Sequence, residues 1–211
     1  MKHIVVVAHP SAGSFTMALA GAYARELEQL GHRQQTCDLY RIGFNPVMAA
    51  GELLPITADH PAESDVMGAQ SDLRDADALT LIYPLWWMSM PATMKGYIDR
   101  VFARGFAYES SEGQVHGLLH GKKAVLITLS GAPLPLLIGN GRWNAVQILQ
   151  DTHILRSTGF DLLEHLHFDE VVPNLPSVSA ERCLARVRRC ARTLFPADVH
   201  PSAAPRRNMG A

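Results

Sequence analysis

Short apolar runs alternate regularly with segments of helical periodicity along this sequence. The runs are rich in β-branched residues and end at polar, glycine or proline positions, a pattern typical of strands buried on both faces. They lie at residues 4–8, 34–39, 78–83, 123–129 and 160–168. Five buried strands separated by helices predict an α/β architecture with a mainly parallel sheet, because each return crossing needs a helix.

Apolar side chains recur at helical spacing between these runs. They predict helices over residues 15–30 with Ser14 as N-cap, 69–74, a segment beginning after Pro91, 144–157, and 179–195 with Ser179 as N-cap. Residues 41–68 lack periodicity and predict a long surface excursion. We expect one domain over residues 1–195, followed by a tail, 196–211, that is poorly ordered or held by a partner.

The number and order of the strands fit a flavodoxin-like sheet of order 2-1-3-4-5, with helices on both faces, better than a larger dinucleotide-binding fold. Ligands of such sheets bind beyond the carboxyl ends of the strands, where the direction of the crossovers reverses. The loops after the first, third and fourth strands are therefore the places to look for chemistry.

The loop after the first strand lacks the signatures of a dinucleotide turn and of a Walker loop. It still offers an imidazole at His9, hydroxyls at Ser14 and Thr16, and free N–H groups at a helix start. These groups suit a phosphate. The alternative is a capped helix start whose hydroxyls bond their own backbone.

The loop after the third strand is apolar and aromatic, and includes Pro84, Leu85, Trp86, Trp87 and Met88. Neighbouring tryptophans on an extended segment point apart, so at least one of them should reach a ligand or another subunit. The segment could lie along a flat heteroaromatic ring, or serve only as a dimer contact.

The loop after the fourth strand contains Ser130 and Gly131, small residues that let the backbone approach a flat ligand. Together the three loops suggest a phosphate-tethered ring across the top of the sheet. Flavin is the simplest ligand of that description.

The sequence resembles the flavodoxin-like NAD(P)H:quinone oxidoreductases, the family of DT-diaphorase, modulator-of-drug-activity proteins and the ancillary subunits of potassium-efflux systems. The similarity is strongest over residues 2–131. It rests on His9-Pro10-x-x-x-Ser14-Phe15, Asp38-Leu39-Tyr40, Phe44-Asn45-Pro46, Tyr83-Pro84-Leu85-Trp86-Trp87, Pro91-Ala92-x-x-Lys95-Gly96-x-x-Asp99-Arg100-Val101-Phe102, Gly105-Phe106-Ala107-Tyr108 and Gly121-Lys122-Lys123-Ala124.

This resemblance implies a homodimeric enzyme with bound FAD, or FMN as in some members, and NAD(P)H as co-substrate. It implies that the phosphates and ribityl chain contact His9, Ser14, Phe15 and Thr16, and that the flavin ring is bordered by Pro84, Leu85, Trp86, Trp87, Met88, Ser130 and Gly131. Arg182 stands where the family offers an arginine to the cofactor. Phe106 and Tyr108 would wall the pocket over the ring, at the dimer interface.

The sequence departs from the family after the fourth strand. Members similar to DT-diaphorase have a Thr-Thr-Gly-Gly turn followed by a Tyr and a His near the flavin, and this chain has Leu137 and Trp143 in the matching places. Asn140 or Arg142 is a candidate for the missing donor. His165 and His167 share a face of the fifth strand, and we interpret them as a polar edge rather than as a metal site.

The reaction implied is ping-pong: a nicotinamide gives hydride to the flavin and leaves, and a quinone-like small-molecule acceptor then takes its place. One alternative is a flavin-binding regulatory subunit of a membrane transporter. A flavodoxin-type electron carrier is a third hypothesis, disfavoured because the chain lacks a strong acidic excess and because Trp86-Trp87 suits a dimer pocket.

The composition argues against other classes of function. The 19 basic and 20 acidic residues nearly cancel, which disfavours a nucleic-acid partner. No apolar run is long enough for membrane insertion or for a signal peptide. The 3 cysteines are scattered, and Cys183 and Cys190 are about 10 Å apart along one predicted helix, too far for a disulfide. Reduced thiols predict a cytoplasmic protein.

Overall fold

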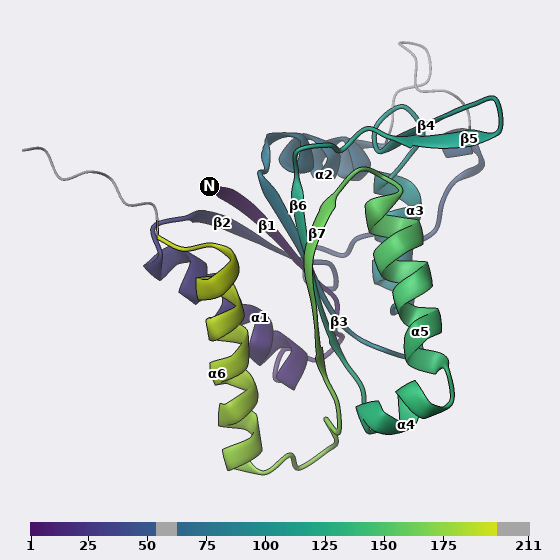
Figure 1. Cartoon of the computed structure of the whole chain (residues 1–211). Coiled ribbons are helices and arrows are strands. Elements are labelled where there is room, and N and C mark those ends of the chain that lie inside the picture. The colour runs from purple at the N-terminus through teal and green to yellow at the C-terminus, as the bar shows by residue number, and fades with distance from the viewer. Residues whose placement is uncertain (54–62, 198–211) are drawn as a thin grey trace, which may run out of the picture.

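A computed structural model describes residues 1–53 and 63–197 of the chain (Figure 1). Its centre is a five-stranded parallel sheet whose order is β2-β1-β3-β6-β7. The strands are β1 (Lys2–Val7), β2 (Arg33–Asp38), β3 (Ala78–Pro84), β6 (Lys123–Leu129) and β7 (Asp161–Phe168). The predicted flavodoxin-like sheet and its order are confirmed, and each observed strand begins and ends within two residues of its prediction.

Helices cover both faces of the sheet (Figure 1). One face packs against α1 (Phe15–Gln29) and α6 (Ser177–Leu194). The other packs against α2 (Ser64–Asp75), α3 (Ala92–Val101), α5 (Arg142–Val146) and the π-helical segment η2 (Gln147–Arg156). Because successive side chains of a strand point to opposite faces, β6 sends Val125 and Ile127 to the first core and Ala124 and Leu126 to the second.

Elements that the sequence analysis missed lie in the connections. A β-hairpin, β4 (Tyr108–Ser111) and β5 (Gln114–Gly117), follows α3, and a short helix α4 (Leu134–Gly139) follows β6. A 3-10 turn, η1 (Ala50–Leu53), lies in the predicted excursion. These segments are too short to show a period, so no local pattern indicates them.

Some predicted helix ends were wrong. Helix α2 starts at Ser64 rather than at residue 69, and α6 starts at Ser177 after Pro176, so Ser179 is not its cap. Ser14 does cap α1, since its Oγ accepts a hydrogen bond from the N–H of Met17 at 3.3 Å. The predicted helix over 144–157 is α5 together with η2.

The excursion after β2 is tied to α3 by the buried Arg100. Its guanidinium donates to the Glu52 carboxylate at 2.8 Å, to the Asp65 carboxylate at 2.6 Å and to the carbonyl oxygen of Asn45 at 2.7 Å. Residues 54–62 of the excursion and 198–211 of the predicted tail lie outside the described residues.

Candidate functional site

The three loops singled out by the sequence meet at one edge of the sheet, which we call the rim. The N–H of Ala8 at the end of β1 donates to the carbonyl of Ile82 on β3 at 3.1 Å. The N–H of Leu85, after β3, donates to the carbonyl of Leu129 at the end of β6 at 2.7 Å. His9 and Trp86 stand edge to face, with ring centroids 6.1 Å apart. Hydrogen bonds and ring contact therefore hold the loops together.

The loop after β3 contains a tight two-residue turn. The N–H of Trp86 donates to the carbonyl of Ser89 at 3.0 Å, and the N–H of Ser89 donates to the carbonyl of Trp86 at 3.0 Å. Between them Trp87 and Met88 have φ angles of 52° and 61°, the left-handed region that bulky residues rarely adopt. Among the described residues, neither of their backbone N–H groups has an acceptor. The turn thus presents two free donors at an energetic cost.

Both tryptophans of this loop are exposed. The side chain of Trp86 is half exposed against His9, whereas Trp87 is 101% exposed. Met88 is partly buried, and Leu85 packs into the core beneath the turn. The expectation that at least one tryptophan is free to contact a ligand or subunit is consistent with this arrangement.

The loop after β1 brings free donors to the same rim. The Nδ1 atom of His9 lies 3.0 Å from the backbone nitrogen of Ser11 and 3.2 Å from its carbonyl oxygen. In the tautomer that accepts from the Ser11 N–H, the neutral ring carries its proton on Nε2. The first-turn N–H groups of Phe15 and Thr16 have no acceptor among the described residues. An imidazole N–H and a helix N-terminus are groups that bind phosphate.

The loop after β6 contributes small residues. Ser130 is buried, and its Oγ donates to the carbonyl of Ala132 at 2.8 Å. Gly131 is exposed, and a Cβ built on it would approach other atoms no closer than 3.8 Å. A Cβ built on Gly13 in the β1 loop would likewise meet no other atom within 4 Å. Packing within the chain therefore requires neither glycine, and the space beside each is open.

Three other predicted residues lie away from these loops. Arg182 is exposed on α6 and makes no hydrogen bond or ion pair with another described residue. Phe106 packs under the Arg74 guanidinium, whose carbon lies 5.2 Å from the ring centroid. Tyr108 belongs to the β4–β5 hairpin. Within one chain, the structure does not bring these residues to the rim.

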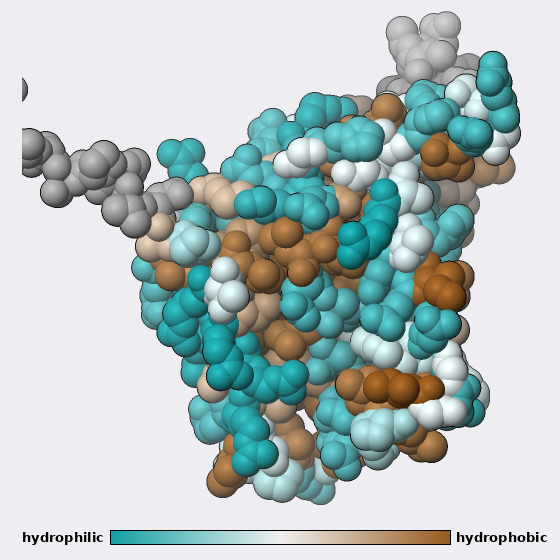
Figure 2. Space-filling view, viewed as in Figure 1, coloured by the Kyte–Doolittle hydropathy of each residue, from teal (hydrophilic) through white to brown (hydrophobic). Residues whose placement is uncertain are grey.

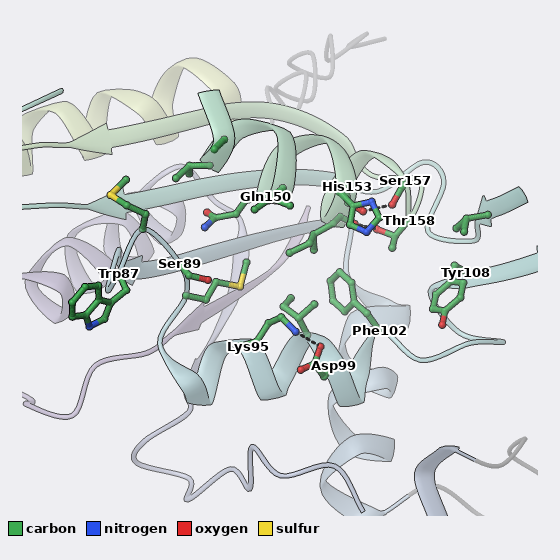
Figure 3. Close-up of a pocket in the computed structure, with 18 of the residues that line it drawn as sticks. Trp87, Ser89, Lys95, Asp99, Phe102, Tyr108, Gln150, His153, Ser157 and Thr158 are labelled. Atoms are coloured by element: carbon green, nitrogen blue, oxygen red, sulfur yellow. Dashed lines mark hydrogen bonds and ion pairs between the residues drawn. The ribbon is translucent and has the colours of Figure 1, made fainter. Parts of the chain in front are cut away.

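A cavity of about 860 Å³ opens between α3 and η2. Figure 3 shows Trp87 and Tyr108 at its opposite ends, with Gln150 between them and the Lys95–Asp99 ion pair along one wall. Of the residues predicted to contact cofactor, Trp87 and Met88 line this cavity. The rim and the cavity therefore meet at the Trp86–Ser89 turn.

A network of buried polar side chains lies beneath α5, and we call it the histidine network. It consists of Asp151 on η2, His165 and His167 on β7, Thr128 on β6, and Ser130. The indole of Trp143 covers both imidazoles, at 4.9 Å from His165 and 4.6 Å from His167 between ring centroids. Both histidines lie on the edge strand β7, as the interpretation of a polar edge requires, but their side chains are buried under a helix rather than exposed.

The environment of His167 keeps its ring neutral. Burial first, and then the nearby His165, lower the pKa of His167 to about 4. A second buried pair lies close by, where the Tyr83 hydroxyl donates to Gln150 Oε1 at 2.7 Å, and burial raises the pKa of Tyr83 well above its usual value. Sequence reasoning missed Asp151 and Gln150. Both point inward from consecutive positions of a π-helical segment, which a helical period does not predict.

Neither candidate for the missing donor joins this network. Asn140 and Arg142 are exposed, and Asn140 Oδ1 accepts from the backbone N–H of Arg142 at 3.2 Å. Arg142 lines the cavity instead. In the described part of the chain, no group of three or more His, Cys, Asp or Glu side chains is arranged to hold a metal ion.

The surface differs between the two sides of the sheet. Figure 2 shows a hydrophilic surface over α6 on the left and apolar atoms on the right, over α5 and η2. Exposed apolar residues there include Ile148 and Leu149, and Val115 is exposed on β5. Among the described helices, none combines the length and the apolar character needed to cross a bilayer.

Comparison with known proteins matches residues 1–191 to a family described as having a flavodoxin-like fold. An NAD(P)H oxidoreductase of Haemophilus influenzae, named as uncharacterized, is 39% identical over 124 residues, 58% of this chain and 61% of that protein. Rat NAD(P)H dehydrogenase [quinone] 1 is 31% identical over 182 residues, 77% of this chain and 66% of that protein. The matches thus span less than two thirds of both relatives' length.

A solved structure gives a fuller match. The NAD(P)H:quinone oxidoreductase from Methanothermobacter marburgensis superposes with a TM-score of 0.83 and 32% sequence identity. The match covers 92% of this chain and 98% of that one. The similarity therefore includes β7 and α6, where the sequence resemblance was weakest.

Proposed function

This chain belongs to the flavodoxin-like fold family, and on that premise we propose that it is a flavin-dependent NAD(P)H oxidoreductase that reduces a quinone-like acceptor. The relatives named above are NAD(P)H oxidoreductases and quinone reductases, which supports the reaction class. The flavin is FAD or FMN, and its place is the rim.

The observation that carries this proposal is the turn at Trp87 and Met88. Two adjacent bulky residues in the left-handed region raise the energy of the loop, and such strain concentrates at binding sites. The turn gives two free N–H donors, which suit the carbonyl and nitrogen acceptors along the edge of a flavin ring.

The other two loops complete a site of matching shape and chemistry. The N-terminus of α1 and the Nε2–H of His9 suit the phosphate end of the cofactor. Open space beside Gly13 and Gly131 lets ligand atoms approach the backbone at both ends of the rim. The residues present therefore fit a flavin, from phosphate to ring.

Bound flavin would supply hydride transfer from a nicotinamide to an acceptor. The nicotinamide and the acceptor would occupy the same site beside the flavin, one after the other. The chain itself binds, orients and excludes water. Trp87 and Met88 border both the rim and the cavity, so a planar substrate that leaves the rim enters the cavity directly. The exposed Trp87 and the apolar residues near the cavity suit a second copy of the chain, and we propose a homodimer closed over this face.

The first experiment is to purify the protein and identify any bound chromophore by absorbance and by mass after heat release. We expect FAD or FMN, oxidation of NADH or NADPH when a quinone is added, and a dimer in solution. Protein that is colourless and takes up neither FAD nor FMN would overturn the proposal.

A matched pair of variants tests the role of the turn. Proline fixes φ near −65° and has no N–H, so Trp87→Pro removes one donor and the left-handed turn. We expect flavin affinity to fall about 10- to 100-fold, the value of one or two hydrogen bonds. Glu112→Pro makes the same change at a φ of 53° in the β4–β5 hairpin, away from the rim, and should leave affinity unchanged. Equal affinity in both variants would contradict the assignment.

A further inference from the structure

The histidine network forms one continuous line of hydrogen bonds that ends at the rim. Asp151 Oδ1 lies 2.7 Å from His165 Nδ1, and His165 Nε2 lies 2.8 Å from Thr128 Oγ1. Thr128 Oγ1 lies 2.8 Å from His167 Nδ1, and His167 Nε2 lies 3.0 Å from Ser130 Oγ. Ser130 Oγ in turn donates to the carbonyl of Ala132 at 2.8 Å. The line therefore runs from Asp151 on η2 to the loop after β6.

Both ends of this line accept hydrogen bonds and cannot donate them when Asp151 is ionised. A carboxylate and a carbonyl oxygen carry no proton, whereas a hydroxyl and a neutral imidazole carry one each. The five bonds named above need one proton each. Thr128, Ser130, His165 and His167 in their neutral forms supply one fewer than that. The network is complete only when it contains an additional proton.

The surroundings place that proton at the Asp151 end. Burial and His165 lower the pKa of His167 to about 4, Arg186 on α6 lowers it further, and Asp169 after β7 raises it. His167 therefore stays neutral near pH 7. His165 faces the Asp151 carboxylate, and its side chain is 4% exposed, so a proton on this ring is paired directly with a negative charge.

We propose that the histidine network holds one additional proton on the His165–Asp151 pair and delivers it, through the Ser130 hydroxyl, to a ligand at the rim that has received a hydride. This proposal rests on the proposed function, because the reaction there transfers hydride. It assigns Ser130 as the proton donor to that ligand, and Asp151, His165, Thr128 and His167 as positioning residues behind it.

The protons and charges balance in this step. A carbonyl acceptor that takes up a hydride gains two electrons and one proton and carries one negative charge. The Ser130 O–H bond breaks, its proton neutralises that charge, and each proton behind it moves one position along the line. Asp151 and His165 are then left with one proton fewer. The Asp151 side chain is 12% exposed, so water can return the missing proton at that end.

The first test counts protons in the ligand-free protein, so it does not depend on flavin binding. Nitrogen-15 NMR of the imidazoles reports which ring nitrogens carry a proton, and carbon-13 NMR reports the state of the Asp151 carboxyl. At pH 7 we expect both nitrogens of His165 to be protonated, and one nitrogen of His167. If both rings are neutral while Asp151 is ionised, the proposal is wrong.

Thr128→Val sharpens this test without removing a titratable group. It deletes the two hydrogen bonds that Thr128 makes with His165 and His167. The three bonds that remain need three protons, which the neutral His165, His167 and Ser130 supply. At pH 7, nitrogen-15 NMR should then show one protonated nitrogen on His165 instead of two. Thr80→Val makes the same change on β3, where the buried Thr80 donates to the Tyr23 hydroxyl of α1, and should leave both protons on His165. Two protons on His165 in Thr128→Val would overturn the proposal.

The second test concerns delivery. In Ser130→Ala, kcat per bound flavin with a quinone should fall about 100-fold, the lower end of proton-transfer contributions, while KM stays the same. Ser130→Thr keeps the hydroxyl and should restore kcat. If Ser130→Ala turns over at the wild-type rate, Ser130 delivers no proton. If the wild type binds no flavin, the proposed function fails and the proton count still stands or falls by NMR.

Discussion

The two ends of the parallel sheet each bury a histidine, and the contrast between them separates packing from chemistry. His3 lies at the amino end of β1, against His32 and Phe195, and neither of its ring nitrogens has a hydrogen-bond partner among the described residues. His167 lies at the carboxyl end of β7, and both of its nitrogens are bonded. The two rings are similarly buried, and the pKa of each is lowered to about 4.

Burial and a lowered pKa therefore do not identify a functional histidine by themselves. His3 fills space between aromatic rings as an apolar residue would, whereas His167 is held in one orientation by Thr128 and Ser130. Only the second position adjoins loops with free donors. The carboxyl end of the sheet therefore carries the chemistry, as expected for an open α/β sheet.

The largest expected effect is on the pH dependence of stability, which tests what the two histidines share. Each has a folded pKa of about 4 against 6.5 for the unfolded chain, so the unfolded state binds more protons between these values. The free energy of unfolding should therefore fall as pH drops from 6.5 to 4, by up to about 1.4 kcal/mol per pH unit for each ring. Urea unfolding across this range measures the slope.

Substitution at His3 should remove about half of that slope. His3→Leu deletes one of the two titrating rings and leaves the rim intact. His116→Leu, at an exposed position on β5, is the control and should leave the slope as in the wild type. If His3→Leu and His116→Leu give the same slope, His3 titrates normally and the comparison between the two ends fails.

The second prediction compares how the loss of each ring changes the free energy of unfolding at one pH. At pH 8, where both rings are neutral, His167→Leu deprives Thr128 and Ser130 of one partner each and should lower the free energy of unfolding by about 2 kcal/mol. His3→Leu removes two buried nitrogens without partners and should raise it by about 1 kcal/mol. Changes of opposite sign in the free energy of unfolding, measured with urea, would confirm that His167 is bonded and His3 is not. A loss of stability in both variants would contradict it.

Much of the fold could be predicted from the sequence. The strands are short β-branched runs and the longer helices have clear periods, so topology and the three rim loops followed from local pattern and the rule of right-handed crossovers. The rim residues His9, Ser14, Trp86 and Trp87 were found because loops at a predicted strand end are few. Their assignment as cofactor contacts remains a prediction.

The histidine network could not be predicted in the same way. His165 and His167 were noticed for their alternation, but their burial depends on Trp143 and on η2, which a single period does not describe. Asp151 enters the network because the π-helical segment turns consecutive residues inward. From the sequence, Thr128 is predicted only to be a buried strand residue. Its contacts with His165 and His167 become visible once β7 is placed beside β6. Contacts between distant segments, rather than local pattern, define this part of the site.

The smallest expected effect concerns backbone strain, which again differs between the two ends. At the amino end, the turn after α1 has a glycine, Gly31, at its left-handed position (φ 84°), and a Cβ added there would meet nothing within 4 Å. At the rim, Trp87 has a φ of 52°. Trp87→Gly should raise the free energy of unfolding by about 0.5 kcal/mol, because relief of left-handed strain exceeds the entropy that glycine adds to the unfolded chain.

Gly31→Ala should do the reverse and lower stability by about 1 kcal/mol, because alanine bears the left-handed penalty and meets no new contact. Urea unfolding at pH 8 measures both changes. Trp87 is 101% exposed, so its loss removes no burial that could hide the effect. If Trp87→Gly destabilises the protein as much as Gly31→Ala does, the rim turn is not strained. In that case the Trp86–Ser89 turn would hold its two free N–H donors without an energetic cost, and the argument that strain marks this turn as a binding site would fail.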